Sequence, residues 1–246
     1  LIIVTDTGNV VPDADTASTI AVSGAVRIVE EQPPTVLRFD PAGLVSQAVS
    51  SVRVVFSKPI LASSFTAEDV TVATPSGTVD PLAITVTAID AVTFRIDFPA
   101  QSAEGDYSVT IGTGVTDLSG NELTALAVGT FSIDNAAPRI TGASPSGTVN
   151  AAVSSVDVTF TEPIELSTFT PTDVTLTDPF GSGITVSAPT LVSGATYRFT
   201  FAVQNANGAY NLTIGPNIED VAGNSLTDVF QGSFTVALPA LVVENV

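Results

Sequence analysis

The sequence predicts an all-β protein built from two similar β-sandwiches in tandem, and three observations support this. Residues 50–60 return in closely similar form as residues 154–164, and residues 117–124 return as residues 220–227. Val, Ile and Phe alternate with Thr and Ser, which is typical of strands that bury one face. Turn-forming residues separate these runs, and no stretch has the period of an amphipathic helix. A chain of 246 residues with this repeat holds two domains of similar size.

The composition excludes most kinds of catalytic and metal site. The chain has no Cys, His, Trp or Met, so Ser–His and Cys–His catalysis and the usual ligands of zinc, copper, haem and iron–sulfur clusters are unavailable. Its 25 Asp and Glu against 7 Lys and Arg give a net charge of −18, which argues against a nucleic-acid partner. No apolar run approaches the roughly 18–20 residues of a membrane span. Such an acidic chain suits an extracellular or cell-surface location, where the charge gives solubility or attracts divalent cations.

About seven strands are predicted in each copy, and the strands match between the copies. Residues 52–56 alternate apolar and polar side chains, as a half-buried strand does. Residues 94–98 place aromatic side chains on one face and polar ones on the other. The matched strands, first copy and then second, are predicted near residues 36 and 140, 52–56 and 156–160, 70–72 and 174–176, 84–86 and 184–186, 94–98 and 197–201, 107–111 and 210–214, and 131–133 and 234–236. Two antiparallel sandwiches of the immunoglobulin type follow, without the disulfide and core Trp of antibody domains.

The repeat sets the predicted domain boundaries at residues 33–137 for the first copy and 138–238 for the second. Length differences between the copies fall between predicted strands, because a slip inside a strand would turn its buried face outward. The linker is only residues 135–137 and is followed by Pro138. A short linker stiffened by proline restricts relative motion, so we expect the two sandwiches to form an elongated rod.

Both flanking segments are expected to belong to a larger context. Residues 1–32 form no complete copy and are interpreted either as the tail of a preceding repeat or as strands that pair with a sheet edge. That edge belongs either to the first copy or to a neighbouring molecule. In the second case each chain would donate a strand to its neighbour, and the chains would join into a filament. Residues 239–246 are a linker or the start of a further repeat.

Two Asp-x-x-Gly-Asn segments carry the candidate metal site. They offer oxygen ligands near a domain boundary, where Asp134 of the linker adds a carboxylate, and Ca²⁺ is the ion that prefers such ligands. The alternative is a tight turn, with glycine at positive φ and the Asp and Asn side chains capping backbone amides. The second copy is the weaker candidate, since Ala237 stands where Asp134 stands in the first. The candidate ligands besides Asp134 are Asp117, Asn121, Asp220 and Asn224.

Other charged residues have two interpretations each. Asp97, Glu104 and Asp106 suggest the paired carboxylates of a glycosidase, but the chain lacks the Trp that usually helps to line a sugar cleft. Arg95 and Arg198 recur at the same place in the two copies. They indicate either an anion site or, more simply, a structural role, in which each arginine forms an ion pair or its aliphatic chain covers the sheet edge.

A set of segments in fixed order, present twice, resembles the bacterial Ig-like repeats of large secreted and surface-anchored proteins, including S-layer-associated proteins and giant adhesins. The resemblance covers residues 33 to about 237. It implies a non-enzymatic extracellular role, and in some such adhesins calcium stiffens the junctions between domains. The segments that carry it are residues 56–60, 65–70, 105–107, 117–121 and 133–138 in the first copy and 160–164, 169–174 and 220–224 in the second.

The leading functional hypothesis is a structural or adhesive spacer of a bacterial surface protein or filament, with neighbouring repeats as its partners. The alternative is a carbohydrate- or protein-binding module that uses the loops at residues 73–83 and 177–195, where the copies differ most. An acid-catalysed hydrolase is the third hypothesis.

Overall fold

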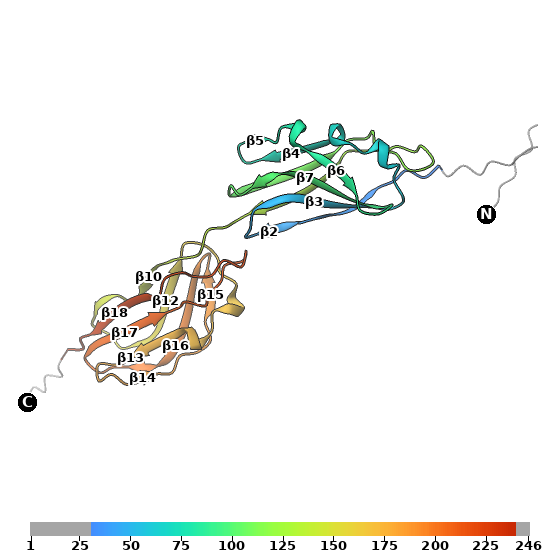
Figure 1. Ribbon diagram of the computed structural model, residues 1–246. Coiled ribbons are helices and arrows are strands. Elements are labelled where there is room, and N and C mark those ends of the chain that lie inside the picture. Colours follow the sequence, from blue (N-terminus) through green and yellow to red (C-terminus); the bar gives the residue numbers. More distant parts are fainter. Residues whose placement is uncertain (1–30, 240–246) are drawn as a thin grey trace, which may run out of the picture. The chain divides into compact units, whose positions relative to one another are not determined.

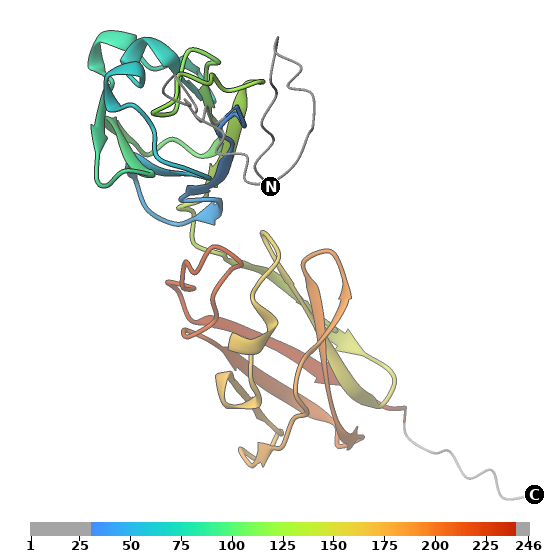
Figure 2. The same ribbon diagram turned by 90° about the vertical axis from the view of Figure 1, so that its right-hand side faces the viewer.

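The structure is a computed structural model that describes residues 31–239. The predicted flanking segments, residues 1–32 and 239–246, lie outside this range except for residues 31, 32 and 239. In the views of Figure 1 and Figure 2 the described chain consists of strands and loops with only short helical turns. None of the helices within residues 31–239 is long and apolar enough to cross a membrane.

The first copy is a sandwich of two sheets. One has the strand order β1-β3-β7-β6 and the other the order β2-β9-β8-β4-β5. Three single-turn 3₁₀ helices, η1 to η3, lie in its connections. The bounds are β1 Val36–Asp40, β2 Gly43–Val45, β3 Val49–Phe56, η1 Ala62–Ser64, η2 Ala67–Asp69, β4 Val70–Thr74, β5 Gly77–Thr78, η3 Pro81–Ala83, β6 Thr85–Ala88, β7 Thr93–Gln101, β8 Gly105–Ile111 and β9 Ala127–Ile133.

The second copy repeats this topology, with the strand orders β10-β12-β16-β15 and β11-β18-β17-β13-β14. The prediction of two tandem immunoglobulin-like sandwiches is therefore confirmed. The bounds are β10 Ile140–Ser144, β11 Gly147–Val149, β12 Val153–Phe160, η4 Leu166–Thr168, η5 Pro171–Asp173, β13 Val174–Thr177, β14 Gly183–Ile184, β15 Thr190–Ser193, β16 Thr196–Gln204, β17 Gly208–Ile214 and β18 Phe230–Val236.

The first predicted strand of each copy is in fact two strands in different sheets. Pro41 separates β1 from β2, and Pro145 separates β10 from β11. Proline has no amide hydrogen for the ladder, and the glycines that open β2 and β11 have φ of 75° and 65°, so the chain turns away from the first sheet at this point. The second piece pairs in parallel with the last strand of its copy, β2 with β9 and β11 with β18. Each predominantly antiparallel sandwich thus contains one parallel pair, and it has nine strands where about seven were predicted.

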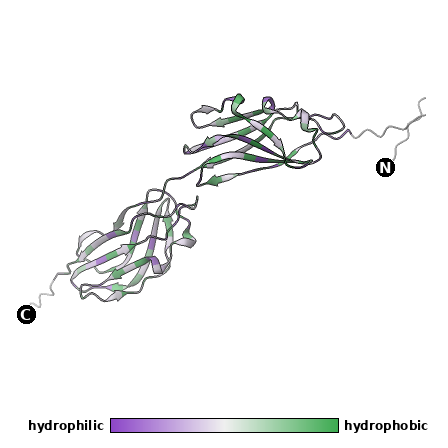
Figure 3. Cartoon of the chain, in the orientation of Figure 1, coloured by the Kyte–Doolittle hydropathy of each residue, from purple (hydrophilic) through white to green (hydrophobic). Residues whose placement is uncertain are grey.

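Aromatic rings between the two sheets form the centre of each core. In the first copy Phe56 meets Phe65 and Phe94 edge to face, with ring centroids 5.6 and 5.7 Å apart. Apolar and polar residues alternate along the strands (Figure 3), as the sequence predicts for strands with one buried face. The equivalent rings of the second copy are Phe160, Phe169 and Tyr197.

A second aromatic pair joins the last two strands of each copy. Tyr107 of β8 stacks on Phe131 of β9 at 4.9 Å, and Tyr210 stacks on Phe234 at the same distance in the second copy. The Tyr107 hydroxyl donates a hydrogen bond of 2.8 Å to the backbone carbonyl of Ala103. The buried ring thereby satisfies its polar end and ties the loop before β8 to the core.

Candidate functional site

The aspartate of the first Asp-x-x-Gly-Asn segment is buried and holds the segment as a turn. One carboxylate oxygen of Asp117 accepts hydrogen bonds from the backbone amides of Ser119 and Asn121, at 2.8 and 2.9 Å. The other accepts from the side-chain amide of Asn121 at 2.9 Å. Gly120 lies at φ 89°, which favours glycine. The geometry is that of the predicted tight turn.

The second segment has the same bonds. Asp220 accepts from the backbone amides of Ala222 and Asn224 at 2.7 and 2.8 Å, and from the Asn224 side chain at 2.8 Å. A third turn of this kind begins at Asp178, whose carboxylate accepts from the amides of Phe180 and Ser182. This third turn is exposed and has no Asn, so its aspartate serves as a turn residue alone.

Asp134 lies beside the turn of the second copy, whereas the sequence predicts a site that it shares with Asp117 and Asn121. Its backbone carbonyl accepts a hydrogen bond of 2.9 Å from the side-chain amide of Asn224. Its carboxylate forms a cluster with those of Glu162 and Asp220, in which one oxygen of each lies within 4.8 Å of the others. The carbonyl and the carboxylate of Asp134 thus lie at the turn of the second copy, while its amide donates to the Val45 carbonyl of the first copy.

Glu162 is the member of this acidic cluster that was not predicted from the sequence. Partial burial raises the pKa of Glu162, and the negative charges of Asp134 and Asp220 raise it further. The signal for it was present in the sequence, because Glu162 belongs to the repeated segment at residues 160–164 and occupies the position of Lys58 in the first copy.

Lys58 supplies a cation at the equivalent place of the first copy. Its Nζ lies 3.6 Å from a carboxylate oxygen of the buried Asp117 and also donates to the carbonyl of Gln32. Within residues 31–239, the groups beside these equivalent aspartates differ in charge, with an ammonium group beside Asp117 and two carboxylates beside Asp220. Hard divalent cations prefer clustered carboxylate and carbonyl oxygens, so the donor set of the acidic cluster fits Ca²⁺ with water completing the shell.

Arg95 and Arg198 form ion pairs, as the simpler interpretation predicts, but with different partners. The Nε and Nη2 atoms of Arg198 donate to the two carboxylate oxygens of Asp157 at 2.5 and 2.7 Å. This pairing lowers the pKa of Asp157 and raises that of Arg198. Arg95 instead donates from Nε to Asp97 on its own strand at 2.9 Å.

Asp97 and Asp106, two of the carboxylates proposed for a hydrolase, do not form a pair across a cleft. Asp97 lies on β7 and Asp106 on β8, which belong to opposite sheets of the sandwich. Asp97 pairs with Arg95, and Asp106 accepts a hydrogen bond from Ser132. Both groups are engaged in structural contacts on different faces.

The loops proposed for binding present isolated apolar side chains to solvent. In residues 73–83, Leu82 is almost fully exposed, and in residues 177–195 the ring of Phe180 is 81% exposed at the tip of the third turn. Single exposed apolar residues are common on protein surfaces. They mark these loops as accessible without defining a ligand.

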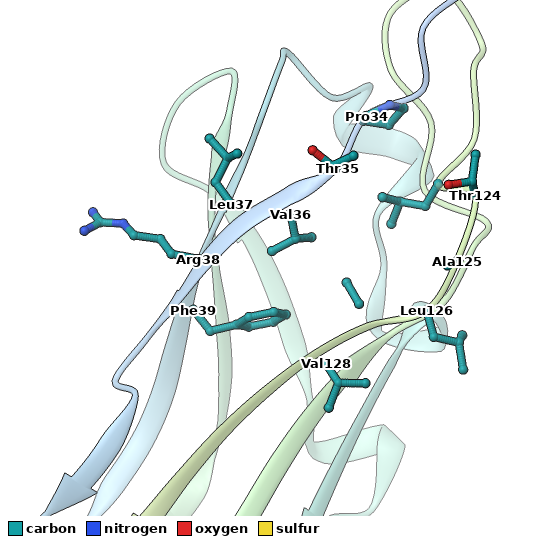
Figure 4. A pocket seen from close by; sticks show the side chains of 12 residues that line it. Pro34, Thr35, Val36, Leu37, Arg38, Phe39, Thr124, Ala125, Leu126 and Val128 are labelled. Atoms are coloured by element: carbon teal, nitrogen blue, oxygen red, sulfur yellow. The ribbon is translucent and has the colours of Figure 1, made fainter.

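A hollow of about 350 Å³ opens between β1 and the start of β9 (Figure 4). The Phe39 ring points into this gap, while Arg38 points away from it. A Cβ atom on Gly129 would overlap the Phe39 ring, so glycine is required opposite it. In the second copy Phe230 of β18 covers Gly232 in the same way.

Solved structures with similar folds include several bacterial proteins. The CopC protein of Methylosinus trichosporium OB3b is 15% identical, with a TM-score of 0.34, over 41% of this chain and 93% of that one. The N-terminal part of the bacterial S-layer protein SbsC is 11% identical, with a TM-score of 0.33, over 84% of this chain and 44% of that one. The Escherichia coli adhesin FdeC is 12% identical, with a TM-score of 0.40, over 86% of this chain and 66% of that one.

These likenesses concern the fold alone, and this chain spans less than half of the SbsC structure. Among curated proteins, none matches the chain. The profile of one family, described as a bacterial Ig-like domain, matches residues 30–133 and 134–236, which are the two copies. The chain therefore belongs to the bacterial Ig-like domain family and carries two of its domains in tandem.

Proposed function

We propose that this chain is a non-enzymatic spacer of a bacterial surface protein, which holds other parts at a distance and bears load along its length. The observation that carries the proposal is the parallel pairing of an early strand with the last strand in each copy, β2 with β9 and β11 with β18. Tension applied through the two ends of a copy pulls such a pair in opposite directions along its length. Several hydrogen bonds must then break together, which resists force better than opening them one at a time.

The parallel pairs are short, so single residues contribute much of their resistance. The Val45 carbonyl accepts a hydrogen bond of 3.0 Å from the Asp134 amide, and the Val149 carbonyl accepts one of 2.9 Å from the Ala137 amide. In a parallel ladder, a residue whose carbonyl accepts a hydrogen bond from a neighbouring strand also donates its N–H to that strand. Proline at either position removes that donor.

Stretching the 246-residue chain in single-molecule force spectroscopy is expected to show two unfolding events. Each should release roughly 330–360 Å of contour length for about a hundred residues. Val45→Pro should lower the unfolding force of one event by roughly half, and Val149→Pro should lower the other, since each removes a bond from the sheared pair. The unmodified copy is the internal control in each variant. A single event for the whole chain, or forces unchanged by both substitutions, would rule out this load path.

We also propose that the second copy binds Ca²⁺ between Asp134, Glu162 and Asp220. Partial burial raises the pKa of Glu162, and the nearby carboxylates of Asp134 and Asp220 add to this effect, so a cation at this point would be stabilised by all three groups. The first copy supports the proposal, because Lys58 lies at the equivalent aspartate there. Asp117 and Asn121 are then turn residues of the first copy, and Asn224 orients Asp134 through its carbonyl.

Millimolar Ca²⁺ is expected to raise the melting temperature of the second copy by about 5 °C, since extracellular calcium modules bind with Kd of about 10⁻⁴–10⁻³ M. Glu162→Lys copies the first domain and should abolish this response while stabilising the calcium-free protein. Differential scanning calorimetry in Ca²⁺ and in chelator measures both effects. A response that survives Glu162→Lys but is lost in Asp117→Asn would place the ion at the first turn instead.

The partners that we propose are neighbouring repeats of the same or an identical chain, in an extracellular or cell-surface setting. Family membership supports this setting. Strand donation from residues 1–32 to a neighbouring molecule, and the elongated rod expected from the short linker, stay predictions.

A further inference from the structure

Each copy carries a row of side chains across the solvent face of one sheet. The row crosses three neighbouring strands, and its members lie directly opposite one another in the strand register. Charged side chains directly opposite on one sheet face interact, favourably when their signs differ and unfavourably when they are alike. The row is Asp40, Arg53 and Arg95 in the first copy and Ser144, Asp157 and Arg198 in the second.

The charges of Asp157 and Arg198 balance each other within the row of the second copy. Arg198 donates two hydrogen bonds to the two oxygens of Asp157, the fork geometry in which a guanidinium binds a carboxylate most strongly. Nothing further is needed to balance these two charges.

The row of the first copy lacks this carboxylate, because Arg53 occupies the position of Asp157. Two guanidinium groups therefore lie opposite each other. Arg95 donates from its Nε to Asp97, and its side chain is 51% exposed. Among residues 31–239 no hydrogen bond or ion pair at contact distance involves the guanidinium of Arg53, although its positive charge acts on nearby Asp90.

A hollow of about 280 Å³ lies over this row. It is lined by Asp40, Pro41, Ser51, Arg53 and Arg95. The space is sufficient for a carboxylate and the ring that carries it, and its walls are polar except for Pro41.

We propose that this hollow binds a carboxylated sugar, a uronate unit of an acidic polysaccharide, through Arg53 and Arg95. The ligand carboxylate takes the place that Asp157 holds in the second copy, where planar guanidinium groups match its two oxygens. Asp40 favours a sugar over an acidic peptide, because its carboxylate accepts hydrogen bonds from ring hydroxyls, which a peptide of glutamate lacks. Ser51 adds a hydroxyl that both donates and accepts.

The net charge of −18 opposes anion binding only at long range. At physiological salt the Debye length is about 8 Å, so distant acidic groups are largely screened while the contact with the two guanidinium groups is not. We therefore expect weak but saturable binding that contributes avidity when many copies meet one polysaccharide. This inference concerns adhesion and needs neither the load path nor the calcium site.

The test is a titration of the 246-residue chain with tetragalacturonic acid, in which NMR chemical shifts report binding. The solution is at physiological salt and contains a chelator, which excludes calcium bridges. Saturable shifts at Arg53 and Arg95 are expected. Arg53→Asp should weaken binding at least tenfold while preserving the fold, because it recreates the ion pair of the second copy. Asp157→Arg should add a second but weaker site in the second copy, where Ser144 stands in place of Asp40. Arg53→Gln is the matched neutral variant and should also lose binding.

Three results would overturn the proposal. The first is unchanged affinity in both Arg53 variants. The second is equal binding of the fully methyl-esterified tetramer, which has no carboxylate. The third is equal or tighter binding of tetraglutamate, which would assign the hollow to acidic peptides instead of sugars.

Discussion

Replacing Phe56 by alanine is expected to lower the free energy of unfolding of the first copy by about 3–5 kcal/mol, the usual cost of emptying a buried aromatic site. The ring is 1% exposed and packs edge to face against Phe65 and Phe94. Deletion of the ring removes both contacts and leaves a cavity between two sheets that cannot close over it. Urea denaturation followed by circular dichroism measures the change.

Phe180→Ala is the matched control for this prediction. The Phe180 ring is 81% exposed, so its removal should change the free energy of unfolding by less than about 0.5 kcal/mol. Phe160→Ala should reproduce the large effect in the second copy, where the ring has equivalent contacts. A loss below about 1 kcal/mol in either core variant would contradict the position of these rings between the sheets.

Asp220→Ala is expected to destabilise the second copy by about 2–4 kcal/mol, because hydrogen bonds to a buried charge are strong and their donors would be left without an acceptor. Asp220 is 1% exposed and accepts from two backbone amides and from the Asn224 side chain. Relief of repulsion from Glu162 offsets part of the loss. Measurement in chelator separates this effect from that of calcium.

Asp178→Ala is the control for the turn itself. Asp178 accepts from two backbone amides in a turn of the same form, but it is only half-buried and residues 180–182 of the turn are exposed, so water replaces the lost acceptor. We expect a loss below about 1 kcal/mol. Equal losses in the two variants would show that the turn, and not the burial of Asp220, determines its contribution.

The strands were predictable because each residue's position on a half-buried strand depends mainly on its neighbours in the chain. Alternation around Phe56 and Phe160 identified β3 and β12, and both rings are buried as expected. The duplication strengthened this prediction, since the two copies differ at many positions and still keep the same alternation in the same strands. The split of the first strand at Pro41 was less predictable, because it depends on which sheet the chain joins after the proline.

The candidate site was predictable only in part. The turn aspartates Asp117 and Asp220 were identified from their spacing to glycine, and the structure gives both the same capping bonds. The surroundings of each aspartate were not predictable in this way. Asp134 lies beside Asp220, and residues 58 and 162 bring opposite charges to the two turns. These neighbours come from distant parts of the chain, and spacing carries no information about them.

By itself the sequence determined the two-copy organisation, the strand phases and the turns, because these follow from local periodicity and from glycine and proline geometry. Only the tertiary structure decided which side chains meet. The ring over the glycine of the last strand illustrates this, since Phe39 supplies it from β1 in the first copy and Phe230 supplies it from β18 in the second. Alignment of the copies shows two unrelated substitutions, Ala143 for Phe39 and Phe230 for Ala127. Close packing requires one ring in that space and is indifferent to which strand provides it.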